Sequence, residues 1–459
     1  MLSLLSHTSS VHQRRLLAKQ SRQGRVQDSC THTKLGGGKE TPSSRRAFAA
    51  TTASATGTST AAKSSGLTYL SSRTLNPLGG GGVAKWIFGT AGMVVGMIHV
   101  GGVTRLTQSG LSMTTWSPLG SLPPITKEQW ETEFRRYQQF PEFEQRKSMT
   151  LSEFKYIYAW EYGHRMLGRI TGLVFCAPWI YFTVRGRIPK GYQLRMAALG
   201  TMGATQGLVG WWMVKSGLGE DRRGDRKEIR VKPIRLAAHL TMAVATYGAL
   251  LWTGLDLLSL PHIHSPNKNG GTGALESLAK QLSSMGRNAI QSTTRLRAGS
   301  MLLAGLTTIT ITSGALVAGN DAGRAYNTFP KMDDAWIPDD ILELAPWHRN
   351  LLENTATVQW NHRLLGTATA STALALSAVG LGRAQGLLIT PQVRKGLMAV
   401  GLAATGQFAL GVSTLLYYVP ISLAAAHQLG SIVVFTSSIY LAHSLRYAKP
   451  ALLRAVKAV

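Results

Sequence analysis

Four histidines, His164, His239, His362 and His427, lie in long apolar stretches of this 459-residue chain. Ionisable residues in segments that could cross a bilayer are costly, and they usually mark functional sites. Two imidazoles that face each other across an apolar slot between helices suit the two axial positions of a haem iron. We therefore interpret the histidines as two pairs of haem-iron ligands, one pair in each half of the chain.

A zinc site is the competing interpretation of these histidines. Zinc sites usually recruit further Cys, His or carboxylate ligands close by, and no HxH, HExxH or CxxC pattern occurs in the apolar stretches. The chain has only two cysteines, Cys30 and Cys176, which excludes a disulfide scaffold and an all-cysteine zinc or iron–sulfur site. A single histidine could be a polar core residue, but four in a repeated pattern favour iron ligation.

The residues next to the histidines fit a large, flat, anionic ligand. Gly168 and Gly366 each follow a histidine by four residues and leave room on the same helical face, although small residues also serve close helix packing. Arg165 and Arg363 directly follow histidines and could hold haem propionates. The alternative is that they simply extend towards the membrane interface.

The two halves differ at one position. Glu161 precedes His164 by three residues, whereas Gln359 occupies the matching place before His362. A carboxylate beside one pair only suggests one working site, where Glu161 could take protons or stabilise positive charge. Alternatively, Glu161 could be an acidic residue in the first turn of a helix, where the helix dipole stabilises a negative charge. His99 is expected to be a packing residue or a propionate contact.

These residues must be positioned by membrane-spanning helices. The chain has 44% hydrophobic and 15% charged residues, yet the apolar ones gather in blocks long enough to span a bilayer, which takes about 20 residues. These blocks argue against a soluble globular enzyme. The net charge of +27 falls in the leader and in alternate short loops, which favours a membrane rather than a nucleic acid as the partner. The eight predicted spans are residues 83–103, 160–184, 194–214, 235–258, 298–319, 358–381, 395–416 and 422–444.

An internal repeat organises the spans. His164-Arg165 recurs as His362-Arg363, residues 206–210 resemble residues 407–411, and the Ala-Ala-His ending at His239 recurs at His427. Four spans per half give two halves of the same orientation, which is a parallel repeat. The predicted fold is an all-α polytopic membrane protein with eight transmembrane helices in two pseudo-symmetric four-helix bundles. Its predicted parts are a leader (1–78), an N-terminal half (79–258), an inter-half linker (259–297), a C-terminal half (298–445) and a tail (446–459).

The leader and the loops predict location and orientation. Residues 1–78 are rich in Arg and Ser and poor in acids, which is typical of a mitochondrial transit peptide, with a disordered basic tail as the alternative. The second, sixth and C-terminal connections carry Lys and Arg without acids, so both mature termini are expected in the matrix, as is the linker. The basic connection between spans 3 and 4 departs from this rule, although acidic residues partly offset it.

At these residues the chain resembles the haem A synthase family in its mitochondrial form. The resemblance covers most of residues 83–445 and rests on several motifs in combination. These motifs are residues 101–107, 109–112, 161–165, 318–323, 326–330, 359–363 and 426–428.

The resemblance implies an oxidoreductase that converts haem O to haem A for cytochrome c oxidase. A ring methyl would be oxidised to a formyl group, with water as the oxygen source. His362 and His427 would bind a haem b cofactor, His164 and His239 would flank the substrate haem, and Glu161 would be catalytic. Some bacterial relatives carry a cysteine pair in the first outer loop, and residues 104–156 contain no cysteine.

The resemblance also implies a setting in the mitochondrial inner membrane. Expected partners are membrane lipid, ferredoxin, haem O synthase and cytochrome c oxidase assembly factors. Association of the chain with copies of itself is a further possibility. No nucleic acid is expected. Arg105, within the first motif, joins Arg165 and Arg363 as a candidate propionate contact.

Two other classes of function remain as alternatives. A diheme b-type cytochrome that exchanges electrons with a quinol would also need two histidine pairs, but it would not need an acidic residue at one of them. A transporter built on a parallel repeat would place polar residues near the membrane centre rather than histidines at one depth.

Overall fold

The computed structural model of the chain describes residues 79–117, 120–219, 229–264, 273–382 and 386–458. Within these ranges the chain folds into helices joined by loops, and the only β-type pairing is a single bridge between Met332 and Ala335. The predicted all-α class is therefore confirmed for the described ranges. The predicted transit peptide, residues 1–78, lies outside them.

Seven helices in the described ranges are long and apolar enough to cross a membrane. Their C-terminal bounds lie within about six residues of the predicted spans, whereas α5 and α9 begin well before the predicted starts at residues 160 and 298. These helices are α2 (Gly79–Leu106), α5 (Leu151–Val184), α7 (Pro233–His264), α9 (Arg287–Gly319), α11 (Thr355–Gly382), α12 (Pro391–Leu416) and α13 (Ile421–Ser444). The chain is a multi-pass membrane protein by the length and composition of these helices.

The predicted third span is also a helix, α6 (Gln193–Lys215), but it is less apolar than the other seven. Its glycines, threonines and Gln206 lower its hydropathy, so composition alone does not establish that it crosses the membrane. Its 23 residues would extend about 34 Å, which is long enough to do so.

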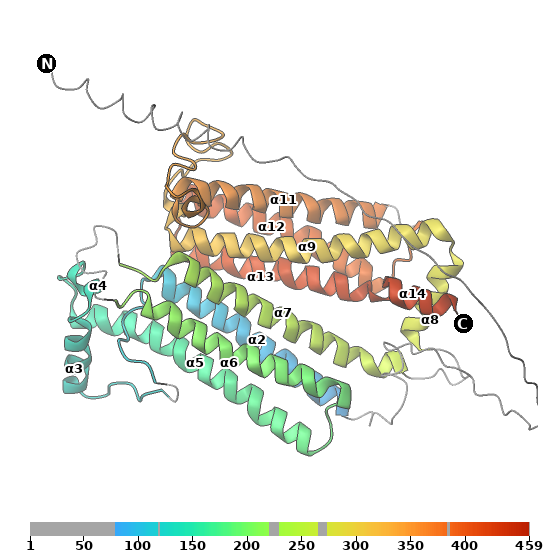
Figure 1. Ribbon diagram of the computed structural model, residues 1–459, viewed down its shortest axis with the longest axis horizontal. Helices are drawn as coiled ribbons and strands as arrows, with labels where there is room; N and C mark the ends of the chain where they lie inside the picture. Colours follow the sequence, from blue (N-terminus) through green and yellow to red (C-terminus); the bar gives the residue numbers. More distant parts are fainter. Residues whose placement is uncertain (1–78, 118–119, 220–228, 265–272, 383–385, 459) are drawn as a thin grey trace, which may run out of the picture. The chain divides into compact units, whose positions relative to one another are not determined.

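The long helices pack mainly within their own half of the chain. In the N-terminal part α2 packs on α5 and α7, and α6 packs on α7; in the C-terminal part α9 packs on α11, α11 on α12, and α12 on α13 (Figure 1). The two parts meet where α7 packs on α9 and α13, and where α2 packs on α13. The inter-part contact therefore runs through α2, α7, α9 and α13.

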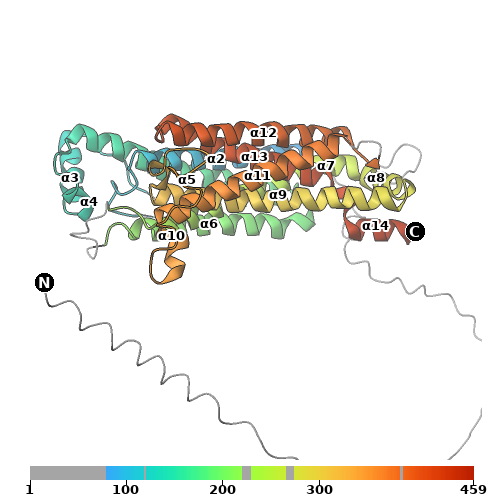
Figure 2. The ribbon, with the colours of Figure 1, turned by 90° about the horizontal axis from the view of Figure 1, so that it is seen from above.

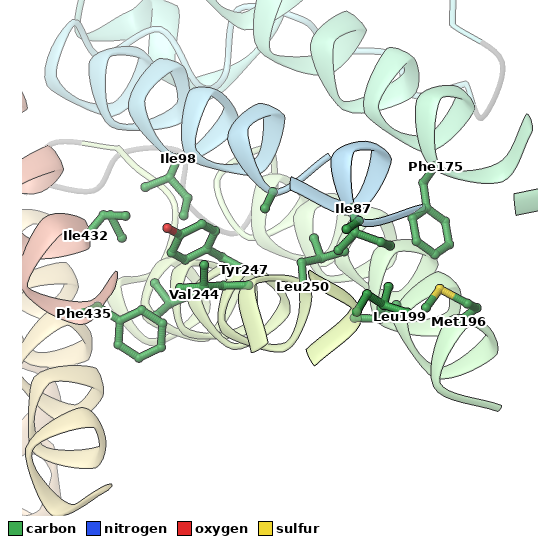
Figure 3. Packing of buried hydrophobic residues seen from close by; sticks show 14 of the residues in the cluster. Ile87, Ile98, Phe175, Met196, Leu199, Val244, Tyr247, Leu250, Ile432 and Phe435 are labelled. Carbon is green, nitrogen blue, oxygen red and sulfur yellow. The ribbon is translucent and has the colours of Figure 1, made fainter. Parts of the chain in front are cut away.

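One buried apolar cluster crosses this contact. Ile87 of α2, Leu250 of α7 and Phe435 of α13 belong to the same cluster, together with side chains of α5 and α6 (Figure 3). At Gly248 the ring of Phe435 lies so close that a Cβ atom would come within 2.9 Å of it. Because lipid is as apolar as these side chains, such close packing is the main force that joins transmembrane helices.

Two short helices, α3 (Lys127–Tyr137) and α4 (Pro141–Glu144), lie at one end of the long helices, here called the α3 end (Figure 2). Tyr137, Phe154 and Tyr158 form a buried aromatic cluster with them. This cluster explains why α5 begins nine residues before the predicted span at residue 160. Thr150 also caps the helix by accepting a hydrogen bond from the backbone N–H of Glu153.

At the opposite end, here called the α8 end, α8 (Ala274–Ser284) and α14 (Pro450–Lys457) pack together (Figure 2). The segment predicted as a linker, 259–297, is therefore largely helical where it is described, and α9 begins at Arg287. A partly exposed ion pair also lies among the helix ends: Asp256 accepts from Arg195 at 2.7 Å and lies 2.9 Å from Nε2 of the buried His443. The remaining short helices are η2 (Lys190–Tyr192), η4 (Ala322–Arg324), η5 (Trp347–Arg349), α10 (Asn350–Glu353) and η7 (Arg446–Ala448).

Candidate functional site

The structure brings the rings of His362 of α11 and His427 of α13 close together. Their ring centroids lie 6.4 Å apart and their planes are perpendicular, with an interplanar angle of 90°. A metal ion bound to two imidazoles at about 2.0–2.1 Å, with about 1.1 Å from each nitrogen to its ring centre, separates the centroids by about 6.3 Å. The observed spacing fits a single iron atom between the two rings.

The hydrogen bonds of these imidazoles leave one nitrogen of each for a metal. Ser313 Oγ lies 2.7 Å from Nδ1 of His362, while Nδ1 of His427 is buried without a hydrogen-bond partner. Neither Nε2 atom makes a hydrogen bond with any described residue. A metal-binding histidine normally uses one ring nitrogen for the metal and orients the ring through the other, and His362 has this arrangement.

His164 of α5 and His239 of α7 form the second pair. Gln206 Nε2 lies 3.2 Å from Nδ1 of His239, and Nδ1 of His164 is buried without a partner. Among the described residues their Nε2 atoms are likewise free of hydrogen bonds, but their rings do not make the direct ring contact seen between His362 and His427. The two pairs therefore share their chemistry and differ in how closely the rings approach.

The structure gives a physical reason for one of the repeated motifs. Gln206 donates from Nε2 to the backbone carbonyl of His239 at 2.9 Å, and Gln407 does the same to His427 at 2.9 Å. Each glutamine thus holds the backbone at the histidine of the next long helix.

The described residues offer no competing metal site. They contain no group of three or more His, Cys, Asp or Glu side chains placed to hold a metal ion together. A zinc site of the usual kind, with three or four protein ligands, therefore has no counterpart in the described ranges.

Glu161 is buried, only 2% exposed, and its carboxylate is fully engaged. Oε2 accepts hydrogen bonds from Ser112 Oγ at 2.7 Å and from the backbone N–H of Met113 at 2.8 Å, and Oε1 pairs with Arg165 at 2.6 Å. Arg165 in turn donates to the carbonyl oxygens of Met113 and Thr115. Glu161 and Arg165 thereby fasten the loop that follows α2 to α5.

Gln359 fastens the matching loop in the other half. Its Nε2 donates to the carbonyl oxygens of Ala322 and Ala325, and its Oε1 accepts from Arg363 at 3.1 Å. The N-terminal loop presents hydrogen-bond donors at this point and the C-terminal loop presents acceptors. The polarity of each loop therefore accounts for a carboxylate on one side and an amide on the other.

The three arginines predicted as propionate contacts all have protein partners. Arg165 and Arg363 bind the two loops, although Nε of Arg363 is buried without a partner. Arg105 donates to the carbonyl of Ala318 at 2.6 Å and pairs with Asp321, which also pairs with Arg230. Arg105 and Arg230 thus bind the N-terminal part of the chain to the end of α9.

The two glycines predicted to make room for a macrocycle differ. A Cβ atom at Gly366 would meet nothing within 4 Å, whereas one at Gly168 would lie 3.3 Å from the terminal methyl of Met97. His99 lies elsewhere, in an apolar groove of about 700 Å³ between α2 and α13, and its Nδ1 has no hydrogen-bond partner.

Sequence patterns did not single out Glu142, a second buried acid near the α3 end. It lies 3.5 Å from Arg146, while its Oε2 has no hydrogen-bond partner. Burial raises the pKa of Glu142 to about 7, and nearby Arg146 partly opposes this effect. Glu142 lies just after Pro141 and two residues before Glu144, a pattern typical of an exposed turn, so the sequence carried no signal of burial.

Together the fold and the site define a class: helical multi-pass membrane proteins in which two long helices of each half carry a pair of histidines. The chain belongs to the COX15-CtaA family, described as cytochrome oxidase assembly protein, which matches residues 84–439.

Named relatives cover most of the chain. It is 45% identical over 382 residues to the heme A synthase COX15 of Arabidopsis thaliana, covering 82% of this chain and 77% of that protein. It is 43% identical over 373 residues to the heme A synthase COX15 of Homo sapiens, covering 79% and 82% respectively. A heme A synthase–mitochondrial ferredoxin fusion protein of Schizosaccharomyces pombe is 39% identical over 378 residues, covering 79% of this chain and 60% of the fusion.

Proposed function

We propose that this chain is a haem A synthase, which oxidises haem O to haem A for cytochrome c oxidase. Family membership supports this activity, because relatives with that name match about four-fifths of the chain. The structural observation that carries the proposal is the pair of facing imidazoles, His362 and His427, with a centroid spacing that suits one iron atom.

His362 and His427 would hold a haem b cofactor between α11 and α13. When bound, haem b supplies a one-electron carrier within the membrane. Ser313 would orient His362 through Nδ1, as outer partners commonly do for metal-binding histidines. The Nε atoms of Arg363 and Arg105, both buried without a protein partner, would be donors left for propionates.

His164 and His239 would flank the substrate, haem O. Conversion of its methyl group to a formyl group with water as the oxygen source releases four protons and four electrons in total, so the site must pass on both.

Glu161 is the acidic residue of this proposed substrate site. Through Ser112, Met113 and Arg165 it holds the loop at the α3 end of α5, three residues from His164. We assign it the acceptance of protons released during methyl oxidation, with the loop contact as its positioning role.

The proposed setting is the mitochondrial inner membrane. With α6 as the eighth span the chain would form two parallel four-helix repeats, and both mature termini would face the matrix. The fission yeast relative supports a ferredoxin as the redox partner, since there the two proteins form one chain.

Chromatography of the haems extracted from the purified protein tests the proposed activity. Co-expression with a haem O source should yield haem b together with haem O or haem A. Haem b alone would contradict the proposal and would favour a diheme electron-transfer cytochrome instead.

A further inference from the structure

Each of the four paired histidines lies against a glycine of the long helix that precedes it in the chain. A Cβ atom placed on these glycines would lie 2.8 Å from the imidazole Cε1 at Gly101 and Gly411, closer than real Cβ atoms come, and 3.0 Å from it at Gly210 and Gly314, where the ring would have to give way by a few tenths of an ångström. The four contacts are Gly101–His164, Gly210–His239, Gly314–His362 and Gly411–His427.

The contact has the same orientation in all four places. The same Cβ positions lie 3.3–3.6 Å from both ring nitrogens, so the Cε1–H edge of each imidazole points at the glycine. Nδ1 and Nε2 then flank the contact on either side. The torsion that rotates a histidine ring is soft by itself, and close contact with the glycine backbone therefore restrains it.

The four glycines also occupy the same place in their helices. Each lies five residues before the last residue of its helix, which is α2, α6, α9 or α12. Four glycines elsewhere in these helices, Gly96, Gly207, Gly305 and Gly406, would meet nothing within 4 Å if they carried a Cβ atom, while others, such as Gly299 and Gly396, meet leucine side chains rather than a histidine ring. General packing through small residues does not explain a contact that recurs at one level and on one edge of the ring.

We propose that Gly101, Gly210, Gly314 and Gly411 are positioning residues that fix the rotation of the haem-binding imidazoles. Each glycine lets the backbone of one helix approach the ring edge on the next helix, and so aims Nε2 at the iron. The inference rests on the proposed function only in that the iron belongs to a haem.

A methyl group at one of these positions must displace the ring or the helix. The helices are held by close contacts on several sides, so a tilt of the imidazole is the smaller movement. A tilted ring bonds iron less well, and the relative orientation of the two ring planes, 90° for His362 and His427, changes with it. Electron paramagnetic resonance (EPR) of low-spin ferric haem responds directly to that interplanar angle.

The test compares Gly314→Ala and Gly411→Ala with Gly305→Ala and Gly406→Ala, which change the same two helices where space is free. The purified holoprotein of each variant is examined by low-temperature EPR, by potentiometric titration of the haem, and by the rate of haem loss to apomyoglobin. The expected result for Gly314→Ala and Gly411→Ala is a shifted largest g value, a shifted midpoint potential and haem loss faster by about 10-fold to 100-fold. The two control variants should match the unchanged protein.

A second arm keeps the test informative if Gly314→Ala folds poorly. In His362→Gly, added imidazole can replace the missing ring and choose its own rotation. The double variant Gly314→Ala/His362→Gly with imidazole should then give the same EPR spectrum as His362→Gly with imidazole. A difference between these two spectra as large as that caused by Gly314→Ala alone would overturn the proposal.

The proposal would also be overturned if Gly314→Ala and Gly411→Ala fold and leave the spectrum, the midpoint potential and the rate of haem loss unchanged. An unchanged protein that binds no haem would instead refute the proposed function, so the two failures are distinguishable.

Discussion

At the scale of residues, the structure separates what the histidines do from what their charged neighbours do. The Nε2 atoms of the imidazoles make no hydrogen bond with the described residues. Glu161, Arg165 and Arg363, in contrast, make hydrogen bonds that attach the loops after α2 and α9 to the helices. The sequence revealed the histidines because ionisable residues stand out in apolar segments. It could not reveal that one loop offers donors and the other acceptors, since that depends on backbone direction after folding.

Glu161→Gln should abolish haem A formation and leave the haem b signal of the C-terminal pair in place. The change removes the charge that would accept protons, and in either orientation its amide NH2 meets a hydrogen-bond donor, at Ser112 and Met113 or at Arg165. Ser112→Ala is the matched control, because it weakens the loop contact by about 1 kcal/mol while keeping the carboxylate. Extracted haems from both variants give the measurement. Equal losses of haem A in the two variants would contradict a role of Glu161 in accepting protons and would leave only its role in holding the loop.

Glu142→Gln should stabilise the protein in a pH-dependent way. The unfolded carboxyl loses its proton near pH 4.5, whereas the native carboxyl, which burial keeps protonated, does so near pH 7. Between these values the unfolded state binds fewer protons, so native stability falls as pH rises. The thermal midpoint of Glu142→Gln should therefore match that of the unchanged protein below pH 4.5 and exceed it above pH 7. A difference independent of pH would show that Glu142 is not buried as an acid.

At the scale of elements, the spans were predictable and their extensions were not. The predicted blocks 395–416 and 422–444 nearly coincide with α12 and α13, because a proline starts or precedes each helix and the apolar run fills it. The early start of α5 depends on aromatic side chains of α3 that are distant in sequence. Two of the glycines that face the histidines, Gly210 and Gly411, end the repeated segments 206–210 and 407–411. The sequence could not show that they contact the imidazoles, because that depends on how the helices pack.

The packing of α9 on α7 gives a prediction at this scale. A Cβ atom at Gly319, the last residue of α9, would lie 2.8 Å from Cα of Pro233, the first residue of α7. Gly319→Ala should therefore lower stability by about 1–3 kcal/mol, because the neighbour is backbone and cannot rotate away. Gly305→Ala, on the same helix but with no neighbour within 4 Å, should be neutral or slightly stabilising. Thermal unfolding in detergent measures both, and equal midpoints would contradict the predicted clash.

At the scale of the whole molecule, the repeat predicted from sequence has a counterpart in matched contacts. Gln206 and Gln407 bind equivalent carbonyls, and Glu161 and Gln359 fasten equivalent loops. The number of membrane crossings is harder to read from the sequence than the repeat, because α6 is long enough to cross the membrane but has modest hydropathy. Polar residues that serve packing or ligand binding between helices lower the hydropathy of a span without removing it from the membrane.

The eight-span topology predicts that α6 separates two sides of the membrane. In a variant with Cys30 and Cys176 replaced by serine, Arg187→Cys precedes α6 and Lys232→Cys follows it, and both positions are exposed. A membrane-impermeant thiol reagent should label one of the two cysteines in intact vesicles and the other only after the membrane is opened. Labelling of both from the same side would contradict the topology and, with it, the placement of both termini in the matrix.

The optical and EPR spectra of the purified protein provide the most direct test of paired imidazole ligation. The unchanged protein should show low-spin ferric haem of the kind that two perpendicular imidazoles produce, and either His362→Ala or His427→Ala should abolish that component. Persistence of the same low-spin signal in both variants, or its absence from the unchanged protein, would contradict the assignment of these histidines as iron ligands.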